Sequence, residues 1–145
     1  MRPDAINIAV FVHVLGAMVL VGGVVTAAGA SIIGWRDESV ALRRFAYRTL
    51  LVVALPAWFV MFGGAMWASS KEHLDDAESA WLTIGHIAAE GGGLLLVIAL
   101  ILGGIGVRKS AAGGGGGLIK ASGVIAALLV ALYILAIWAM GAKPA

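Results

Sequence analysis

Four long apolar segments alternate with three short polar ones along the chain. A transmembrane helix takes about 20 residues to cross a hydrocarbon core of ~30 Å. Each apolar segment reaches that length, and the four cover residues 6–33, 46–68, 81–107 and 117–140. The pattern predicts an all-α polytopic membrane protein, an up-down bundle of four transmembrane helices that forms a single domain over residues 1–145.

The three connectors between the predicted spans differ in composition. The first, from Trp35 to Arg44, is charged, and the second, from Ser69 to Ala80, is acidic. The third contains a run of five glycines, Gly113 to Gly117, which we expect to be a flexible linker without a defined turn. None of the connectors is long enough to form a domain of its own.

The composition agrees with a membrane protein and argues against other classes. Hydrophobic residues make up 61% and charged residues 12% of the 145 residues, which leaves too little polar surface for a water-soluble globule. A net charge of +2 is too small for a nucleic-acid-binding surface. The chain has no cysteine, so disulfides and thiolate metal sites are excluded. No motif of a hydrolytic triad or a nucleotide site is present, so we do not expect a self-sufficient soluble enzyme.

Basic residues predict the orientation in the membrane. Seven lie at the first and third connectors: Arg36, Arg43, Arg44, Arg48, Arg108, Lys109 and Lys120. Three lie on the other side: Arg2, Lys71 and Lys143. Because cytoplasmic loops of membrane proteins are enriched in Lys and Arg, the first and third connectors are predicted in the cytoplasm and both termini outside.

Small residues predict how the helices pack. Helices in lipid associate through close contact between small side chains, since burial of apolar surface gives no advantage there. The first span has a heptad stripe that we expect to be buried: His13, Gly16, Leu20, Gly23, Ala27, Ala30 and Gly34. The second span offers Ala54, Ala57, Met61, Gly64 and Ala68. The same span contains Pro56, which predicts a kink because proline removes a helical hydrogen bond.

Three titratable side chains lie well inside the predicted spans: His13 in the first, and His86 and Glu90 in the third. Both of these spans enter from the same side, and the rise per residue places both histidines roughly 8–11 Å deep. Glu90 lies four residues after His86 and so on the same helix face. The two helices are diagonal partners in an up-down bundle, where such bundles build cofactor sites, so the three side chains can converge.

Four interpretations of these residues stay open. His13 and His86 are suited to be the axial ligands of a b-type haem, with nearby glycines leaving room for the macrocycle. Together with Glu90 they match a two-histidine, one-carboxylate site for copper, iron or zinc. Intramembrane histidines and carboxylates also mark proton pathways, which here would require an oligomer. Alternatively, a histidine hydrogen-bonded to Glu90 only holds the helices together.

The segment His13-Val-Leu-Gly-Ala-Met-Val-Leu-Val-Gly-Gly begins with a histidine and ends with two glycines. It resembles the first helix of small predicted integral membrane proteins related to the CopD copper-resistance family, and His86 fits the same pattern. The resemblance implies a bacterial inner-membrane protein that handles copper or haem through His13 and, in a later helix, His86. The chain is much shorter than a CopD transporter and lacks a methionine-rich outer domain.

A second class of function needs no cofactor. The small-residue faces can pack against other subunits, which would make the chain a homo-oligomer or an accessory subunit of a larger membrane complex. The two classes differ in what purification should give. A haem protein is coloured, whereas an accessory subunit is colourless and co-purifies with its partners.

Overall fold

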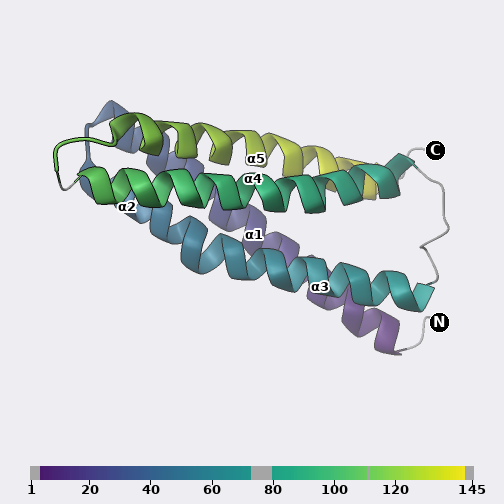
Figure 1. The fold of residues 1–145 in the computed structure, drawn as a ribbon. Helices are drawn as coiled ribbons and strands as arrows, with labels where there is room; N and C mark the ends of the chain where they lie inside the picture. Colours follow the sequence, from purple (N-terminus) through teal and green to yellow (C-terminus); the bar gives the residue numbers. More distant parts are fainter. Residues whose placement is uncertain (1–3, 73–79, 111, 143–145) are drawn as a thin grey trace.

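The computed structural model describes residues 4–72, 80–110 and 112–142, which are helical apart from two short turns. In chain order the helices are α1 (Asp4–Arg36), α2 (Val40–Thr49), the π-helical turn η1 (Leu50–Ala54), α3 (Leu55–Glu72), α4 (Ala80–Ser110) and α5 (Gly116–Ala142). Since α2, η1 and α3 follow one another without a break, the chain traverses the bundle four times (Figure 1). Each traverse is long and apolar enough to cross a membrane, which confirms the predicted all-α bundle of four transmembrane helices.

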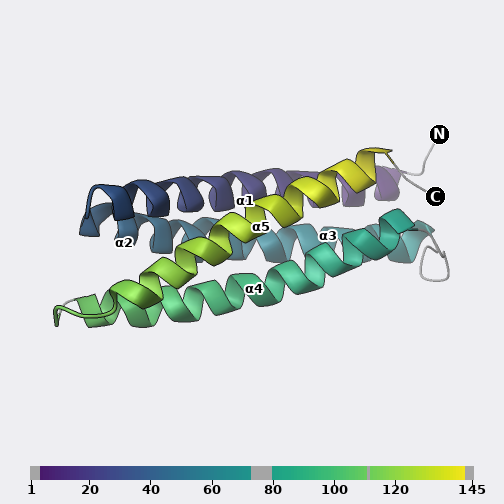
Figure 2. The same ribbon diagram turned by 90° about the horizontal axis from the view of Figure 1, so that it is seen from above.

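The bundle consists of two antiparallel hairpins. In one, α1 packs along α2 and α3, and in the other, α4 packs along α5. The hairpins are joined mainly where α1 contacts α5, and α1 and α4 lie diagonally, as the sequence predicts. The hairpins are inclined to each other: in Figure 1 they overlap near the α1–α2 turn and separate toward the chain termini, whereas Figure 2 shows the two turns displaced from each other and α5 running obliquely toward α1. We call the end with residues 37–39 and 112–115 the arginine end, and the opposite one the terminal end.

The charged connector is shorter than its composition suggests. Only Asp37, Glu38 and Ser39 lie between α1 and α2, so most of the basic residues expected in a loop lie on a helix. Ser39 caps α2, because its hydroxyl accepts a hydrogen bond from the backbone nitrogen of Leu42 at 3.3 Å. The Arg43 side chain donates to the carbonyls of Glu38 and Ser39 and closes the turn.

The π-helical turn η1 lies directly before Pro56. Its last hydrogen bond runs from the Leu55 nitrogen to the Leu50 carbonyl, five residues back. A proline ring collides with the carbonyl four residues earlier in a regular α-helix, here that of Val52. One wider turn therefore accommodates the proline at the place where the sequence predicts a kink.

The glycine run forms a defined turn, unlike the slack linker that its composition suggests. Gly113 and Gly115 have positive φ angles of 79° and 82°, a conformation that glycine adopts without strain. The Gly114 nitrogen donates to the Lys109 carbonyl at 3.1 Å, and the Gly115 carbonyl accepts from the nitrogens of Leu118 and Ile119. The run thus ends α4 and begins α5 at fixed positions.

The predicted small-residue stripe of α1 is buried. Apart from His13, which is half-buried, all its members are buried: Gly16, Leu20, Gly23, Ala27, Ala30 and Gly34. On the facing helix, four of the five predicted residues are buried: Ala54, Ala57, Met61 and Gly64. A Cβ atom at Gly64 would lie 2.6 Å from the backbone nitrogen of His13, so the two backbones approach closely. Residues 73–79, most of the acidic connector, lie outside the described residues.

Candidate functional site

His13 links α1 to α3. Its Nδ1 atom lies 2.9 Å from the carbonyl oxygen of Met61. Because a carbonyl can only accept a hydrogen bond, Nδ1 must donate, and in the neutral ring Nε2 then carries the lone pair. The partner is a backbone carbonyl rather than the Glu90 carboxylate that the sequence suggests.

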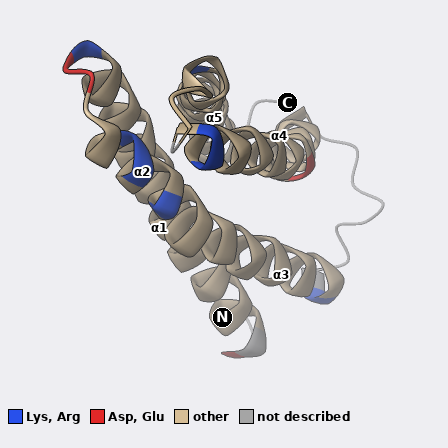
Figure 3. Cartoon of the chain, turned by 60° about the vertical axis from the view of Figure 1, so that its left-hand side comes forward, with Lys and Arg blue, Asp and Glu red and all other residues tan. Residues whose placement is uncertain are grey.

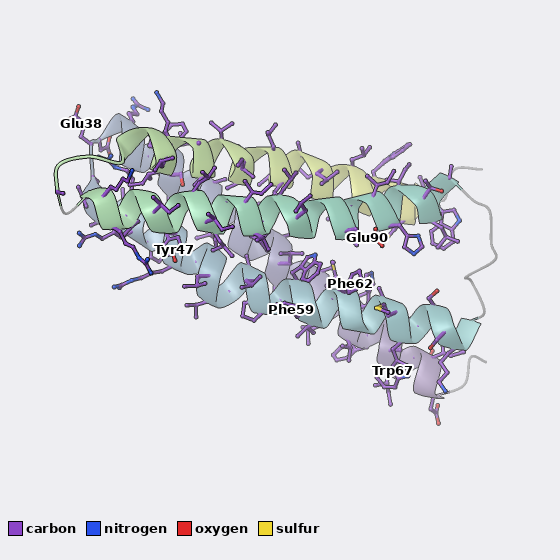
Figure 4. The ribbon with its side chains drawn as sticks, viewed as in Figure 1. Glu38, Tyr47, Phe59, Phe62, Trp67 and Glu90 are labelled. Carbon is purple, nitrogen blue, oxygen red and sulfur yellow. The ribbon has the colours of Figure 1, made fainter. Side chains whose placement is uncertain are left out.

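His86 and Glu90 lie on α4, four residues apart, and both are exposed in this chain. Neither side chain has a hydrogen bond or an ion pair within the part of the chain that the structure describes. Figure 4 draws Glu90 on the side of α4 toward which α3 lies in that view. Two ionisable groups inside an apolar span are therefore left without a partner among the described residues.

The exposure of His86 follows from the divergence of α3 and α4. Gly93, seven residues later on the same helix face, lies against the ring of Trp58 from α3. Trp58 stacks on Phe62 at a centroid distance of 5.1 Å, and its Nε1 donates to the carbonyl of Ala89 at 2.8 Å. Two turns nearer the terminal end, the same face of α4 carries His86, and there it is exposed.

The structure brings His86 and Glu90 onto one face and places His13 on the other hairpin. Among the described residues, no three His, Cys, Asp or Glu side chains are grouped so that they could hold a metal ion. His13 contributes a half-buried imidazole, and His86 an exposed one. The site formed by all three residues stays a prediction.

Sequence reasoning did not identify the polar contacts that join the helices. Trp58 bonds α3 to α4, and the Ser122 hydroxyl donates to the Ala99 carbonyl at 2.7 Å, which joins α5 to α4. The buried hydroxyl of Tyr133 has no hydrogen-bond partner among the described residues, and its ring lies against Gly92. Trp and Tyr are enriched at the membrane–water interface, but Trp58 and Tyr133 lie in the middle of their spans. This unusual position in the sequence could have indicated that both side chains make contacts between helices.

Together, the fold and these side chains define the class: a small multi-pass integral membrane protein with a polar face on one of its four spans. No protein family, curated protein or solved structure matches the chain.

Proposed function

We propose that this protein is a non-catalytic building block of a membrane complex, and that its first contact is with a second copy through the outer half of α4. The observation that carries this proposal is the exposure of His86 and Glu90 inside an apolar span. An ionised side chain in hydrocarbon costs about 2.5–3.5 kcal/mol or more. A partner that hydrogen-bonds both groups removes much of that cost.

The spacing of the two residues suits a symmetric pair. Two copies with the same orientation in the membrane are related by a two-fold axis along the membrane normal, and each presents the same patch. His86 of one copy then lies one helical turn from Glu90 of its partner. An imidazole donor and a carboxylate acceptor at that offset are self-complementary.

The absence of cysteine from the chain allows a direct test by disulfide cross-linking. Val97 lies seven residues after Glu90 on the same face and is 44% exposed, so Val97→Cys should give cross-linked dimers in native membranes. Leu128→Cys, on α5 and 56% exposed, is the matched control and should stay monomeric. Adding Glu90→Leu should reduce the Val97→Cys dimer strongly, whereas Glu90→Gln, which still accepts a hydrogen bond, should preserve more of it.

Equal cross-linking at Val97→Cys and Leu128→Cys would mean random collision and would overturn the proposal. The same conclusion would follow if Val97→Cys failed to cross-link and light scattering in a mild detergent gave the mass of one chain.

We propose a bacterial inner membrane as the location, with both termini outside, on the basis of the seven-to-three distribution of basic residues. Single cysteines at Asp4 and Glu38, both exposed, report the two ends of the bundle. A membrane-impermeant maleimide should label Asp4→Cys in intact cells and Glu38→Cys only after permeabilisation. The reverse labelling would invert the proposed topology.

Haem or metal binding is a second candidate, favoured by the hydrogen bond of His13. Metal-ligating histidines commonly donate their other ring nitrogen to a backbone carbonyl, which fixes the tautomer and the ring orientation. The Nδ1 contact with Met61 is of this kind and leaves Nε2 as the ligand atom. His86, with Glu90 beside it, would supply the second ligand, and the resemblance to CopD-related proteins points the same way.

Optical spectra of purified protein, oxidised and then reduced with dithionite, test this candidate. A Soret band with sharp reduced bands should be present in the wild type and absent in His13→Ala and His86→Ala. The His86 variant is the cleaner of the two, because His86 has no partner among the described residues. A colourless wild type from haem-replete cells, with no copper, iron or zinc by elemental analysis, would refute it.

A further inference from the structure

A pocket at the arginine end lies between α2 and α4, at the opposite end of the bundle from His86. It has a volume of about 310 Å³ and is lined by Arg44, Tyr47, Arg48, Gly104, Val107 and Arg108. Three of these six residues are arginines, contributed by two different helices. Figure 3 shows that Lys and Arg residues of α2 and of the end of α4 gather at this end of the bundle.

The three arginines of the pocket have no counter-charge among the residues that the structure describes. Arg44, Arg48 and Arg108 make no hydrogen bond or ion pair with any residue that the structure describes, and all three are exposed. Two other basic residues at this end are engaged. Arg43 donates to the turn carbonyls, and the Lys120 Nζ atom lies 5.6 Å from the centroid of the Trp35 ring.

Tyr47 adds a neutral donor to the same pocket. Its ring lies against the glycines of α4: a Cβ at Gly103 would be 3.0 Å from Cδ2, and one at Gly104 would be 3.1 Å from the hydroxyl oxygen. Any larger residue there would displace the ring. The hydroxyl has no hydrogen-bond partner among the described residues, and Figure 4 shows Tyr47 beside α4 near the arginine end.

The chemistry of the lining selects an oxyanion. A guanidinium group presents a planar set of N–H donors that matches a phosphate, commonly through two hydrogen bonds at once. Three cations around one pocket also repel one another, and a bound anion converts that repulsion into attraction. A phosphate group satisfies both the guanidinium groups and the phenol.

The surroundings of the pocket favour a lipid as the source of that phosphate. Leu51 lies three residues after Arg48, deeper in the span, and is 40% exposed. Ile101 lies seven residues before Arg108 on the same helix face and is 55% exposed. Both belong to spans that are apolar enough to cross a membrane. A phosphate in the pocket would thus continue into acyl chains along exposed apolar side chains.

We infer that this pocket binds the headgroup phosphate of an anionic phospholipid, with Arg44, Arg48, Arg108 and Tyr47 as its donors. Basic residues near a membrane surface attract anionic lipids in general. This site is more specific, because it is a pocket built from two helices. The inference is independent of the proposed contact between two copies, which lies at the other end of α4.

Native mass spectrometry of the detergent-purified protein tests the inference. The probes are dioleoyl-phosphatidylglycerol, dioleoyl-phosphatidylcholine and inorganic phosphate. The wild type should retain phosphatidylglycerol in preference to phosphatidylcholine, and millimolar inorganic phosphate should not displace it. Each arginine that is replaced by glutamine should weaken retention about fivefold, so Arg44→Gln with Arg108→Gln should nearly abolish the preference.

The matched control is Arg36→Gln with Lys109→Gln, which removes the same charge at the same end without touching the pocket. It should retain phosphatidylglycerol like the wild type, and Tyr47→Phe should show a smaller loss than either arginine. If the control and pocket variants lost phosphatidylglycerol to the same extent, surface charge alone would explain the retention, and the inference would be overturned. Displacement by inorganic phosphate would identify a soluble anion as the ligand and overturn it as well.

Discussion

The two hairpins of the bundle use glycine in different ways. Between α1 and α3, glycines bring backbone against backbone: a Cβ at Gly16 would overlap the Met61 nitrogen, and one at Gly64 would lie 2.6 Å from the His13 nitrogen. Between α4 and α5, a Cβ at Gly106 near the turn would lie 2.9 Å from the backbone nitrogen of Ile119, but glycines nearer the terminal end receive side chains. Gly92 lies under the Tyr133 ring. A Cβ placed at Gly85 would lie 2.8 Å from the methyl carbon of Met140.

The difference decides how each hairpin responds to added volume. A backbone cannot move without moving its whole helix, whereas the end of a side chain can rotate away. Gly16 and Gly64 of the first hairpin should therefore tolerate a methyl group far less well than Gly85 and Gly92 of the second. The helix-forming tendency of alanine opposes the steric cost everywhere, by about 0.5–1 kcal/mol. Glycine-to-alanine substitutions measure the balance at each site.

The largest effect is expected at the backbone contacts of the first hairpin. Gly16→Ala and Gly64→Ala should each lower the free energy of unfolding by about 1–3 kcal/mol, since α1 and α3 must separate. Equilibrium unfolding by SDS in bicelles, followed by tryptophan fluorescence, gives the value. Gly63→Ala is the matched control, because a Cβ there meets nothing within 4 Å. Equal stability of Gly64→Ala and the control would contradict the close approach.

A smaller loss is expected under the Tyr133 ring. A Cβ at Gly92 would lie 2.7 Å from the Tyr133 hydroxyl, so Gly92→Ala should lower the free energy of unfolding by about 1 kcal/mol. Tyr133→Phe removes the buried hydroxyl, which has no described partner, and should restore part of the loss in the double variant, because the ring carbons Cε1 and Cζ still lie 2.9 and 3.0 Å from that Cβ. Additive effects of the two substitutions would contradict a contact between the Tyr133 hydroxyl and residue 92.

Between the hairpins, a hydrogen bond of the Trp58 side chain joins α3 to α4. Trp58→Phe keeps the stacking partner for Phe62 but removes the hydrogen bond to Ala89, and should cost about 0.6–2 kcal/mol. Ser122→Ala removes the comparable bond inside the second hairpin and serves as its reference. If Trp58 sets the spacing at the terminal end, only its replacement should increase hydrogen exchange in the first turns of α4.

The sequence predicts the architecture well because a lipid bilayer allows few kinds of spanning structure. Apolar length determines the spans, and the heptad of small residues correctly identifies the buried face of α1 from Gly16 to Gly34. The reading of Pro56 as a point of distortion agrees with η1. The turn at Gly113 to Gly115 was missed because glycine permits many conformations, and composition does not say which hydrogen bonds select one.

The candidate site was harder to predict for a geometrical reason. Helical spacing correctly puts His86 and Glu90 on one face, but it does not say whether a neighbouring helix covers that face. The answer depends on the divergence of α3 from α4 beyond the contact of Trp58 with Ala89 and Gly93, which is a long-range property. His13 was assigned to a buried face by the same spacing, and its Met61 carbonyl partner is invisible in any side-chain pattern.

The smallest changes in the free energy of unfolding are expected at glycines where an added methyl group meets little or nothing. There the substitution can stabilise the protein instead of destabilising it. At Gly22, which is exposed on α1, a Cβ meets nothing within 4 Å. Gly22→Ala should therefore stabilise the protein by about 0.5–1 kcal/mol, because only the helix-forming tendency changes. Gly85→Ala should fall near zero, since the mobile end of Met140 can move aside at little cost. If Gly22→Ala lowered the stability of the protein in membranes but not as a detergent-solubilised monomer, another copy would pack on that face of α1. The close backbone contacts of the first hairpin would then extend to a second chain.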